Sequence, residues 1–317
     1  MSKKVSIIIA NWNGKSLLKE CIPSVIEAVK FNGNDHEIII VDDGSTDDSV
    51  IFVKSNYPLV RVIELKKNRG FASAGNTGVA NSNHPIVILL NNDVVVKKDF
   101  IKPLIESFYD DNIFAVGPKV LWKNEDNKEV IYFGKAEACF KYGMFRVKYP
   151  WEIDSDKMEY PGVSLYAGGG FAAFDKNKFL EIGGFDEIYY PFYFEDLDLS
   201  YRAWKRGWKV LYAPQSIVFH KHQGTIGKNF KEDVVKCIEK KNALIFVWKN
   251  ITDNRFMVQH IFFLLLRLVW WIVTGNITYI KSLIYACKQL SKILAARSRE
   301  RQYHLPDRAI IKIINEE

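Results

Sequence analysis

The sequence predicts an α/β protein, with a mostly parallel sheet flanked by helices and a helical region at the C-terminal end. Three observations support this fold class. Short apolar runs alternate with helical segments through the first third of the chain. These runs are apolar throughout rather than alternating with polar residues, which is typical of strands buried on both faces. After Val234 the pattern becomes helical.

The expected strands are short and rich in β-branched residues. They are Val5–Ala10, Glu37–Val41, Val60–Leu65 and Ile86–Leu90. Apolar residues at helical spacing predict a helix over Ser16–Lys30. The Ser and Asp residues of "DDGSTDDS" are good helix starters, and Val50–Lys54 continues as a helix. The segment "NRGFASAGNTGVANS" predicts a loop that opens a helix of small residues.

Length and composition exclude wholesale disorder, but they do not identify the ligand. The 317 residues suffice for one large core and an appendage, and 48% of them are hydrophobic. A net charge of +7 suits an anionic ligand or an anionic membrane surface. The apolar run near the N-terminus has strand length, so we expect no signal peptide. The scattered cysteines are expected to be reduced, buried thiols of a cytoplasmic protein. They are Cys21, Cys139, Cys237 and Cys287.

Polar residues follow three of the expected strands. They are Asn11 and Asn13, Asp42 and Asp43, and Asn91 to Asp93. In open α/β sheets ligands bind at the carboxyl ends of the strands, so these loops mark the expected site. The first strand is followed by neither a Walker-type phosphate loop nor a Gly-x-Gly-x-x-Gly fingerprint. Nucleoside triphosphate hydrolysis and dinucleotide binding are therefore disfavoured.

Two of these loops have a structural and a functional interpretation. The carboxylates of "VDDGSTDDS" would either cap a helix or accept hydrogen bonds from a base or ribose. Gly70, Gly75 and Gly78 would either let backbone amides approach a ligand or form a tight turn and a closely packed helix.

Three further segments, around Asp93, Glu195 and His220, suggest metal and acid–base chemistry. Asp93 is a hard oxygen ligand suited to Mg²⁺ or Mn²⁺, and a buried Asp without a partner costs several kcal/mol. In "YFEDLDLSYR", Asp198 and Arg202 are one helical turn apart and would form an ion pair. Glu195 and Asp196 then stand at the start of a helix. They would either act in acid–base catalysis or only form a charged helix start. His220 and His222 would be metal ligands or structural residues.

These motifs occur in the order seen in family 2 inverting glycosyltransferases. The matching segments are "VSIIIANWNG", "IIIVDDGSTDDS", "NRGFASAGNTG", "LLNNDV", "AGGGFAAF", "GGFDEIYYPFYFEDLDLSYR" and "HKHQGT". The resemblance covers about residues 4–225. It looks most like the bacterial rhamnosyltransferase-like branch that builds lipid-linked surface polysaccharides.

The resemblance implies a GT-A fold, with a Rossmann-like sheet, and a sugar-nucleotide donor. The residues that it implies hold the donor or the acceptor are Ala10, Asn11, Asp43, Gly70, Asn92, Gly169, Gly170 and Glu195. It implies that Asp93 and His220 lie at the metal and diphosphate, with Mg²⁺ or Mn²⁺ as the cofactor. Asn91 stands where the family's Asp-x-Asp motif has its first acid, so only Asp93 offers a charge there. Asp196 matches the family's general base.

The expected function is inverting transfer of a sugar, with rhamnose suggested by the branch, from a dTDP- or UDP-sugar. The expected acceptor is a hydroxyl of a glycan or a polyprenyl-diphosphate-linked molecule, with no nucleic acid involved; oligomerisation stays open. The catalytic domain is expected over 1–230 and a helical, membrane-associated region over 231–317. A sugar-nucleotide nucleotidyltransferase and a non-catalytic sugar-nucleotide-binding protein are the alternatives.

The most apolar window is Met257–Val273. Gln259, His260 and Arg267 interrupt it, and charge at mid-bilayer is costly. Interface-preferring aromatics and basic residues follow. They are Trp270, Trp271, Tyr279, Lys281, Lys288, Lys292, Arg297, Arg299 and Arg301. We therefore expect an amphipathic helix in the plane of the cytoplasmic face of the cell membrane, with a core or dimer-packing helix as the alternative.

Overall fold

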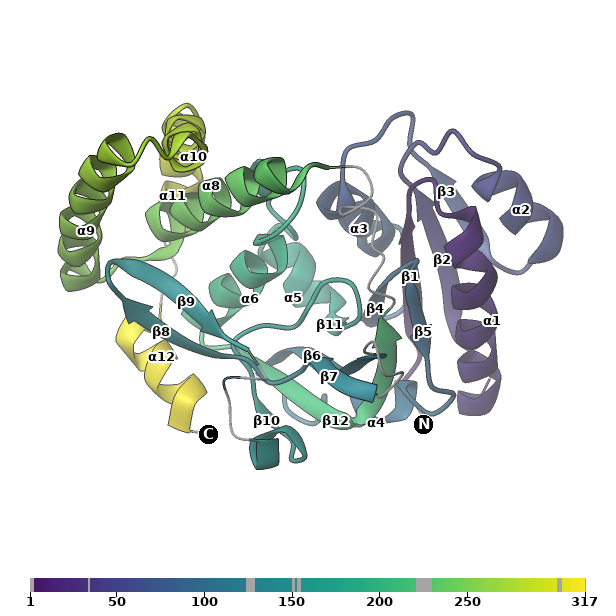
Figure 1. Ribbon diagram of the computed structural model, residues 1–317. Coiled ribbons are helices and arrows are strands. Elements are labelled where there is room, and N and C mark those ends of the chain that lie inside the picture. Colours follow the sequence, from purple (N-terminus) through teal and green to yellow (C-terminus); the bar gives the residue numbers. More distant parts are fainter. Residues whose placement is uncertain are drawn as a thin grey trace.

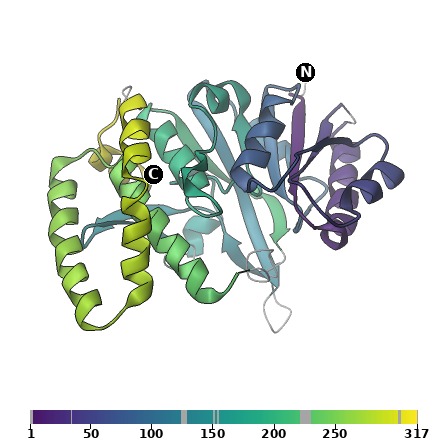
Figure 2. The same cartoon turned by 90° about the horizontal axis from the view of Figure 1, so that it is seen from above.

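A computed structural model describes residues 3–33, 35–123, 129–149, 152, 155–220, 230–300 and 304–316. Its centre is a sheet with the strand order β10-β12-β6-β11-β4-β1-β2-β3. Helices flank this sheet, and the N-terminal helices α1 and α2 lie at the opposite end of the molecule from the C-terminal helices α8 to α10 (Figures 1 and 2). The predicted α/β architecture with C-terminal helices is confirmed.

The N-terminal half follows the predicted alternation of strands and helices. Its strands are β1 (Val5–Asn11), β2 (Glu37–Asp42), β3 (Arg61–Glu64) and β4 (Ile86–Asn91). Its helices are α1 (Lys15–Asn32), α2 (Ser49–Asn56) and α3 (Phe71–Ala80). The four strands are parallel, and the register pairs Asn11 with Asp42 and Ala10 with Asn91. The carboxyl ends of three strands therefore meet, which places their polar loops side by side.

The sheet is mixed, because β5, β7, β10 and β11 run antiparallel to the strands they pair with. The other strands of this sheet are β5 (Val94–Val96), β6 (Ile113–Lys123), β7 (Glu129–Phe133), β10 (Gly162–Val163), β11 (Ala173–Asp175) and β12 (Lys209–His220). β11 is antiparallel to both β4 and β6. The expectation that the first strands are buried throughout is wrong for β3, whose ends Arg61 and Glu64 are exposed because it lies at the edge of the sheet.

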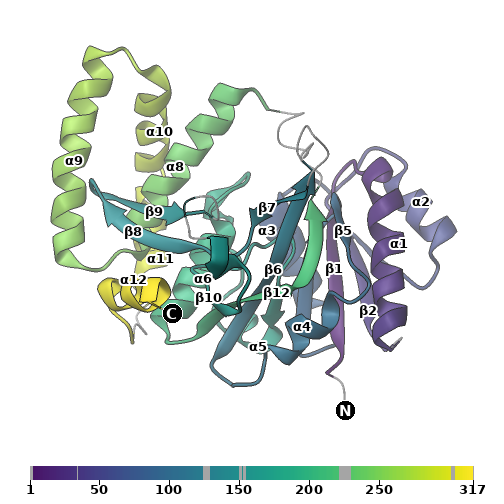
Figure 3. The same ribbon diagram turned by 60° about the horizontal axis from the view of Figure 1, so that its bottom comes forward.

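Shorter helices connect the second half of the sheet. They are α4 (Ile101–Glu106), α5 (Lys176–Glu181) and α6 (Glu195–Lys205). A separate hairpin of β8 (Glu137–Lys141) and β9 (Met144–Lys148) leaves the sheet and reaches the C-terminal helices (Figures 1 and 3). This hairpin carries one wall of the cavity described below.

The C-terminal region packs against α6 and the β8–β9 hairpin rather than standing apart. Its helices are α8 (Glu232–Asn250), α9 (Asn254–Val273), α10 (Ile277–Cys287), α11 (Leu290–Arg299) and α12 (Asp307–Glu316). α8 contacts α6 and β9, and α12 contacts α6 and β8. Buried Asp307 accepts a hydrogen bond from Tyr201 Oη at 2.5 Å and pairs with Lys205 Nζ at 2.7 Å. The boundary at residue 230 stays a prediction.

The expectation of buried thiols holds for one cysteine. All four are free, but Cys21 alone is buried, while Cys287 is exposed on α10. Burial and the nearby charge of Asp93 raise the pKa of the Cys21 thiol to about 12, which keeps it protonated. Spacing along the chain excluded a metal cluster but carried no information on exposure.

Candidate active site

One cavity of about 2080 Å³ opens between the N-terminal strands and the C-terminal helices. Ligand pockets usually measure roughly 300–1,000 Å³, so this one has room for two substrates. Every predicted site residue lines it. They are Ala10, Asn11, Asp43, Gly70, Asn92, Asp93, Gly169, Gly170, Glu195, Asp196 and His220. The sheet topology thus brings together residues as far apart in the sequence as Ala10 and His220.

The ends of β1, β2 and β4 are joined by a buried chain of hydrogen bonds. Asn92 Nδ2 donates to Asn11 Oδ1 at 2.8 Å, and Asn11 Nδ2 donates to Asp42 Oδ2 at 2.9 Å. Asp42 also accepts from the Ser45 backbone and hydroxyl. The side chains of Asn11 and Asn92 are therefore committed to one another. Their contribution to a ligand comes from the fixed backbone that they support.

Asp43 shapes the loop that follows β3. Its carboxylate accepts backbone hydrogen bonds from Arg69 at 2.9 Å and from Gly70 at 2.7 Å. Burial raises the pKa of Asp43, although both hydrogen bonds oppose that shift. Gly70 has a φ of 86°, a left-handed conformation that glycine adopts without strain. Asp43 and Gly70 therefore form one unit at the cavity wall.

The other glycines of this loop serve packing, as the structural alternative predicted. A Cβ on Gly78 would collide with Ile8, and one on Gly75 would lie 3.0 Å from the ring of Phe185. Both glycines let α3 lie directly on its neighbours. Gly14, which sequence reasoning missed, likewise faces the amides of Asn11 and Asn92 with no space for a Cβ.

Asp93 lies in the turn before β5, and His220 ends β12, which pairs with β5 at the cavity. β12 is antiparallel to β5, and this register puts His220 opposite Val94. His220 Nε2 lies 3.4 Å from Asp93 Oδ1. Asp93 Oδ1 is buried and accepts no hydrogen bond in the described part of the chain. Within the same ranges no group of three His, Cys, Asp or Glu side chains forms a metal cluster. His222 lies outside the described residues.

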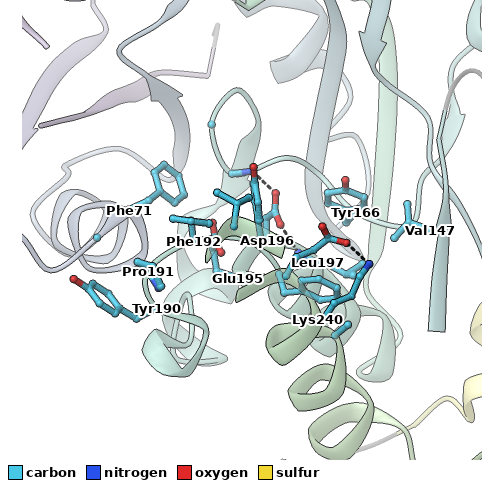
Figure 4. Close-up of a pocket in the computed structure, with 18 of the residues that line it drawn as sticks. Phe71, Val147, Tyr166, Tyr190, Pro191, Phe192, Glu195, Asp196, Leu197 and Lys240 are labelled. Atoms are coloured by element: carbon cyan, nitrogen blue, oxygen red, sulfur yellow. Dashed lines mark hydrogen bonds and ion pairs between the residues drawn. The ribbon is translucent and has the colours of Figure 1, made fainter. Parts of the chain in front are cut away.

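Glu195 and Asp196 begin α6 and face the cavity (Figure 4). Asp196 Oδ1 accepts from its neighbour Leu197 N at 2.8 Å, and Oδ2 accepts from Gly169 N at 3.3 Å. Burial raises the pKa of Asp196, and these hydrogen bonds oppose it. Burial and the adjacent charge of Asp196 raise the pKa of Glu195 to about 8. At neutral pH Glu195 therefore carries a proton, and the neighbouring charge of Asp196 is one cause of this.

The first turn of α6 rests on a buried ionic network. The predicted pair of Asp198 and Arg202 is confirmed, with Arg202 Nε 2.7 Å from Asp198 Oδ2. Lys249 Nζ and Asn250 Nδ2, both from α8, lie 2.8 Å from Asp198 Oδ1. The Lys249 and Arg202 cations hold the pKa of Asp198 far below its ordinary value. Asp198 is therefore a structural anion, unlike the two carboxyls before it.

The loop before α6 is also held from α8. Asn242 Nδ2 lies 2.8–2.9 Å from the carbonyl oxygens of Tyr189, Phe192 and Tyr193. Tyr193 and Phe194 have φ values of 69° and 79°, a backbone conformation that residues other than glycine rarely adopt. Sequence reasoning missed Asn242 and Lys249. One pattern in the sequence could have indicated them. Asn242, Lys249 and Asn250 stand at positions i, i+7 and i+8 of the otherwise apolar run "NALIFVWKN", which places them on one helix face.

Comparisons with known proteins agree with this geometry. The model of the family described as "Glycosyl transferase family 2" matches residues 6–182, and that of "Glycosyltransferase (GlcNAc)" matches residues 119–254. N-acetylgalactosaminyltransferase 7 of Drosophila melanogaster is 25% identical over 274 residues, which are 81% of this chain and 45% of the relative. Poly-beta-1,6-N-acetyl-D-glucosamine synthase of Staphylococcus aureus is 24% identical over 238 residues, 73% of this chain and 53% of the relative. The chain spans about half the length of these curated relatives.

Solved structures share the fold. The crystal structure of GalNAc-T7 with UDP, GalNAc and Mn²⁺ superposes with a TM-score of 0.59 at 22% identity, over 78% of this chain and 48% of that one. A mannosyltransferase from Pyrobaculum calidifontis, in complex with GDP-Man and Mn²⁺, gives a TM-score of 0.57 at 15% identity, over 99% of this chain and 85% of that one. The family match covers more than half of the sequence. The chain therefore belongs to glycosyl transferase family 2.

Proposed function

We propose that this protein is an inverting glycosyltransferase that moves a sugar from a nucleotide diphosphate sugar to an acceptor hydroxyl. One observation carries the proposal. The acid pair Glu195–Asp196 faces the same cavity as the Asp93–His220 pair and the polar loops at the carboxyl ends of β1, β2 and β4. A nucleotide, its diphosphate and a proton acceptor can therefore act at one place.

The donor end of the cavity is the end formed by the first three loops. Ala10 and Asn11 would present backbone groups to the nucleoside, and the rigid Asp43–Gly70 unit would form its wall. The ordered motifs support a dTDP-deoxysugar such as dTDP-rhamnose as the donor. The names of the relatives support an N-acetylhexosamine, and the solved structure of GalNAc-T7 holds UDP, so a UDP-N-acetylhexosamine is the other candidate. Both donors present a diphosphate toward Asp93.

Asp93 and His220 fit a divalent cation such as Mg²⁺ or Mn²⁺. A buried carboxylate oxygen without a hydrogen bond, as on Asp93, is costly unless a cation meets it. Mg²⁺ is usually held by one or two carboxylates together with substrate phosphates, which suits a site with few protein ligands. When bound, the cation would neutralise the charge that builds on the diphosphate leaving group.

Asp196 would act as the general base. It removes the proton of the acceptor hydroxyl, whose oxygen forms a bond to the anomeric carbon as the bond to the diphosphate oxygen breaks. Attack from the face opposite the diphosphate inverts that carbon. The amides of Gly169 and Leu197 stabilise the ionised carboxylate. Buried Phe192 and Tyr166 line the cavity beside it and limit the access of water (Figure 4).

The test is a panel of UDP-, dTDP- and GDP-sugars, each with Mg²⁺ or Mn²⁺, in which release of the nucleoside diphosphate is measured. Asp196→Asn should lower turnover roughly 100- to 10,000-fold with little change in donor affinity. Glu195→Gln is the matched variant and should cost less. Near-normal turnover of Asp196→Asn with an inactive Glu195→Gln would reverse the assigned roles. Release of pyrophosphate from a nucleoside triphosphate and a sugar phosphate would instead identify a nucleotidyltransferase.

The cation has its own test. EDTA and Asp93→Asn should each abolish turnover, while Asp99→Asn, an exposed carboxylate nearby, should leave it unchanged. Full activity in EDTA would show that cationic side chains neutralise the diphosphate. Mn²⁺ binding measured by electron paramagnetic resonance, without substrate turnover, provides an independent readout.

Association with the cytoplasmic face of a membrane is part of the proposal. α9 has 20 residues, a mean hydropathy of 1.9 and only 11% of its apolar window buried, so it is not a core helix. One face packs on the protein, where buried His260 contacts Gly143 O at 2.6 Å. The opposite face is exposed and apolar. Its residues are Val258, Ile261, Phe262, Leu265, Leu266, Val269, Trp270, Ile272 and Val273. This two-sided character supports a helix lying in the membrane plane.

Basic residues near α9 support the same orientation, with one correction. Lys281, Lys288, Lys292 and Arg299 are exposed. Arg297 instead donates to Trp248 O at 2.8 Å and Ile251 O at 2.7 Å, so it caps the end of α8. Arg301 lies outside the described residues. Flotation with anionic vesicles tests the membrane surface, and a concentration-dependent dimer without vesicle binding would favour dimer packing.

A further inference from the structure

The cavity extends past the acid pair into a groove between the β8–β9 hairpin and helices α8, α9 and α10. The hairpin turn reaches α9, where a Cβ on Gly143 would meet the backbone of Gln259 and His260 (Figure 1). The groove has basic and apolar lining residues. They are Lys141, Arg146, Arg267, Met144, Val147, Leu264, Trp271 and Tyr279. None of these residues belongs to the predicted donor set.

Three of these residues are cations that contact one residue of the hairpin turn, Tyr142. Lys141 Nζ and the Arg146 guanidinium lie 5.0 and 5.7 Å from the centre of the Tyr142 ring. Arg267 Nη2 donates to Tyr142 O at 2.5 Å. No salt bridge within the described ranges involves any of the three. By contrast, Lys148 and Lys240, which line the same cavity, each pair with a carboxylate.

Arg267 is the most constrained of the three. Its Nη1 is buried and has no hydrogen-bond partner in the described chain. Burial and the charge of Arg146 lower the pKa of Arg267, which shows that two like charges are held near each other. A guanidinium with an unused donor beside a second guanidinium is stabilised by an anion with several acceptor oxygens. Phosphate and diphosphate groups meet that description.

The surface beyond these cations is apolar. Leu264 and the stacked rings of Trp271 and Tyr279, 5.1 Å apart, line the groove on the side of α9 and α10. The exposed apolar face of α9 lies on the opposite side of this helix from Leu264 and Trp271. A ligand that fills this groove therefore carries its anionic group next to an apolar chain. A free sugar or a free phosphate would leave the apolar side uncovered.

We propose that the groove binds the phosphate or diphosphate of a lipid-linked acceptor through Arg146, Arg267 and Lys141, with the lipid chain along α9. The proposal rests on the glycosyltransferase function proposed above, because it assigns the second substrate of that site. It gives the acceptor a fixed direction. The sugar end points to Asp196 and the lipid end to Leu264, Trp271 and Tyr279.

Direct binding tests this assignment without any transfer reaction. Geranylgeranyl diphosphate is titrated into the full chain while tryptophan fluorescence is recorded, and geranylgeraniol and inorganic pyrophosphate are the comparison ligands. The diphosphate lipid should bind at least tenfold more tightly than either. Arg146→Gln and Arg267→Gln should each weaken its binding roughly tenfold, since a hydrogen bond to a charged group is worth that much. Arg299→Gln, an exposed cation on α11, is the matched control and should bind normally.

Three results would overturn the assignment. They are equal binding of the alcohol and the diphosphate, unchanged binding in both arginine variants, and equal weakening in Arg299→Gln. Vesicles of phosphatidylglycerol distinguish a bilayer surface from a single lipid. If Arg146→Gln abolishes flotation with these vesicles but leaves geranylgeranyl diphosphate binding intact, the cations bind the headgroups of bilayer lipids and the proposal fails. The Arg146 side chain is exposed and makes no described hydrogen bond, so its substitution does not threaten folding. Arginine-dependent binding without any transfer would refute the proposed function and leave the lipid phosphate site standing.

Discussion

Substitution of Lys249 by Met should destabilise the protein by removing one partner of a buried anion. Asp198 is fully buried, and Lys249 Nζ lies 2.8 Å from Asp198 Oδ1 and 2.6 Å from Asp186 Oδ2. Removal of one member of a buried ion pair typically costs about 3–5 kcal/mol. Arg202 and Asn250 remain in contact with Asp198, so we expect about 3 kcal/mol, the lower end of that range.

The assay is urea unfolding at pH 7 and pH 5. The folded-state pKa of Asp198 is depressed, so its stabilisation is present above its ordinary pKa and is lost as the pH falls below it. The difference between wild type and Lys249→Met should therefore be the same at both pH values. Lys236→Met, which removes an exposed cation on the same helix, should unfold like the wild type.

A double variant provides the sharpest check. Lys249→Met combined with Asp198→Asn removes both charges, so it should recover at least about 1 kcal/mol relative to Lys249→Met alone. A loss smaller than about 1 kcal/mol for Lys249→Met would refute the reasoning. So would a double variant whose cost is the plain sum of the two single costs.

Three further predictions concern the site itself. The pH profile of kcat/KM should show a step near pH 8, where Glu195 ionises. Glu195→Gln should remove this step, while the rise at lower pH that comes from ionisation of Asp196 should remain. Persistence of the step in the variant would assign it to another group. Gly170→Ala should lower turnover at least tenfold, because its Cβ would lie 2.6 Å from Asn91 Cγ, whereas Gly117→Ala, whose Cβ would meet nothing closer than 3.8 Å, should not affect turnover. Asn242→Ala removes the donor from three backbone carbonyls. It should lower the free energy of unfolding in urea by about 2–3 kcal/mol and should also lower kcat. Normal values of both would show that these hydrogen bonds do not hold the loop in place.

The N-terminal strands could be predicted from sequence because buried parallel strands have an unmistakable composition. Apolar runs that end in Asn or Asp mark both the strand and its carboxyl end, so Asn11, Asp43 and Asp93 were found together. The antiparallel β11 could not be found in this way. Its three residues, Ala173–Asp175, are too short to show a period, and their direction depends on a connection made in space.

The supports of the site were harder to predict than its lining. Asp198 and Arg202 were paired because their spacing along one helix is a local property. Lys249 and Asn242 reach α6 and its loop from more than forty residues away, and no local pattern encodes that docking. The environment of Glu195 was missed for a related reason. A helix start favours an anion, but burial and the charge of Asp196 outweigh that preference.

α8 has one face in each half of the cavity, and this creates thermodynamic linkage between the two substrates. Ala243 and Leu244 line the cavity, while Asn242 holds the loop before the acid pair. A ligand that orders α8 from the groove also orders that loop. By reciprocity, a donor that orders the loop must strengthen binding in the groove by the same factor. We therefore expect synergy between donor and acceptor, so that the affinity measured for either substrate depends on the concentration of the other.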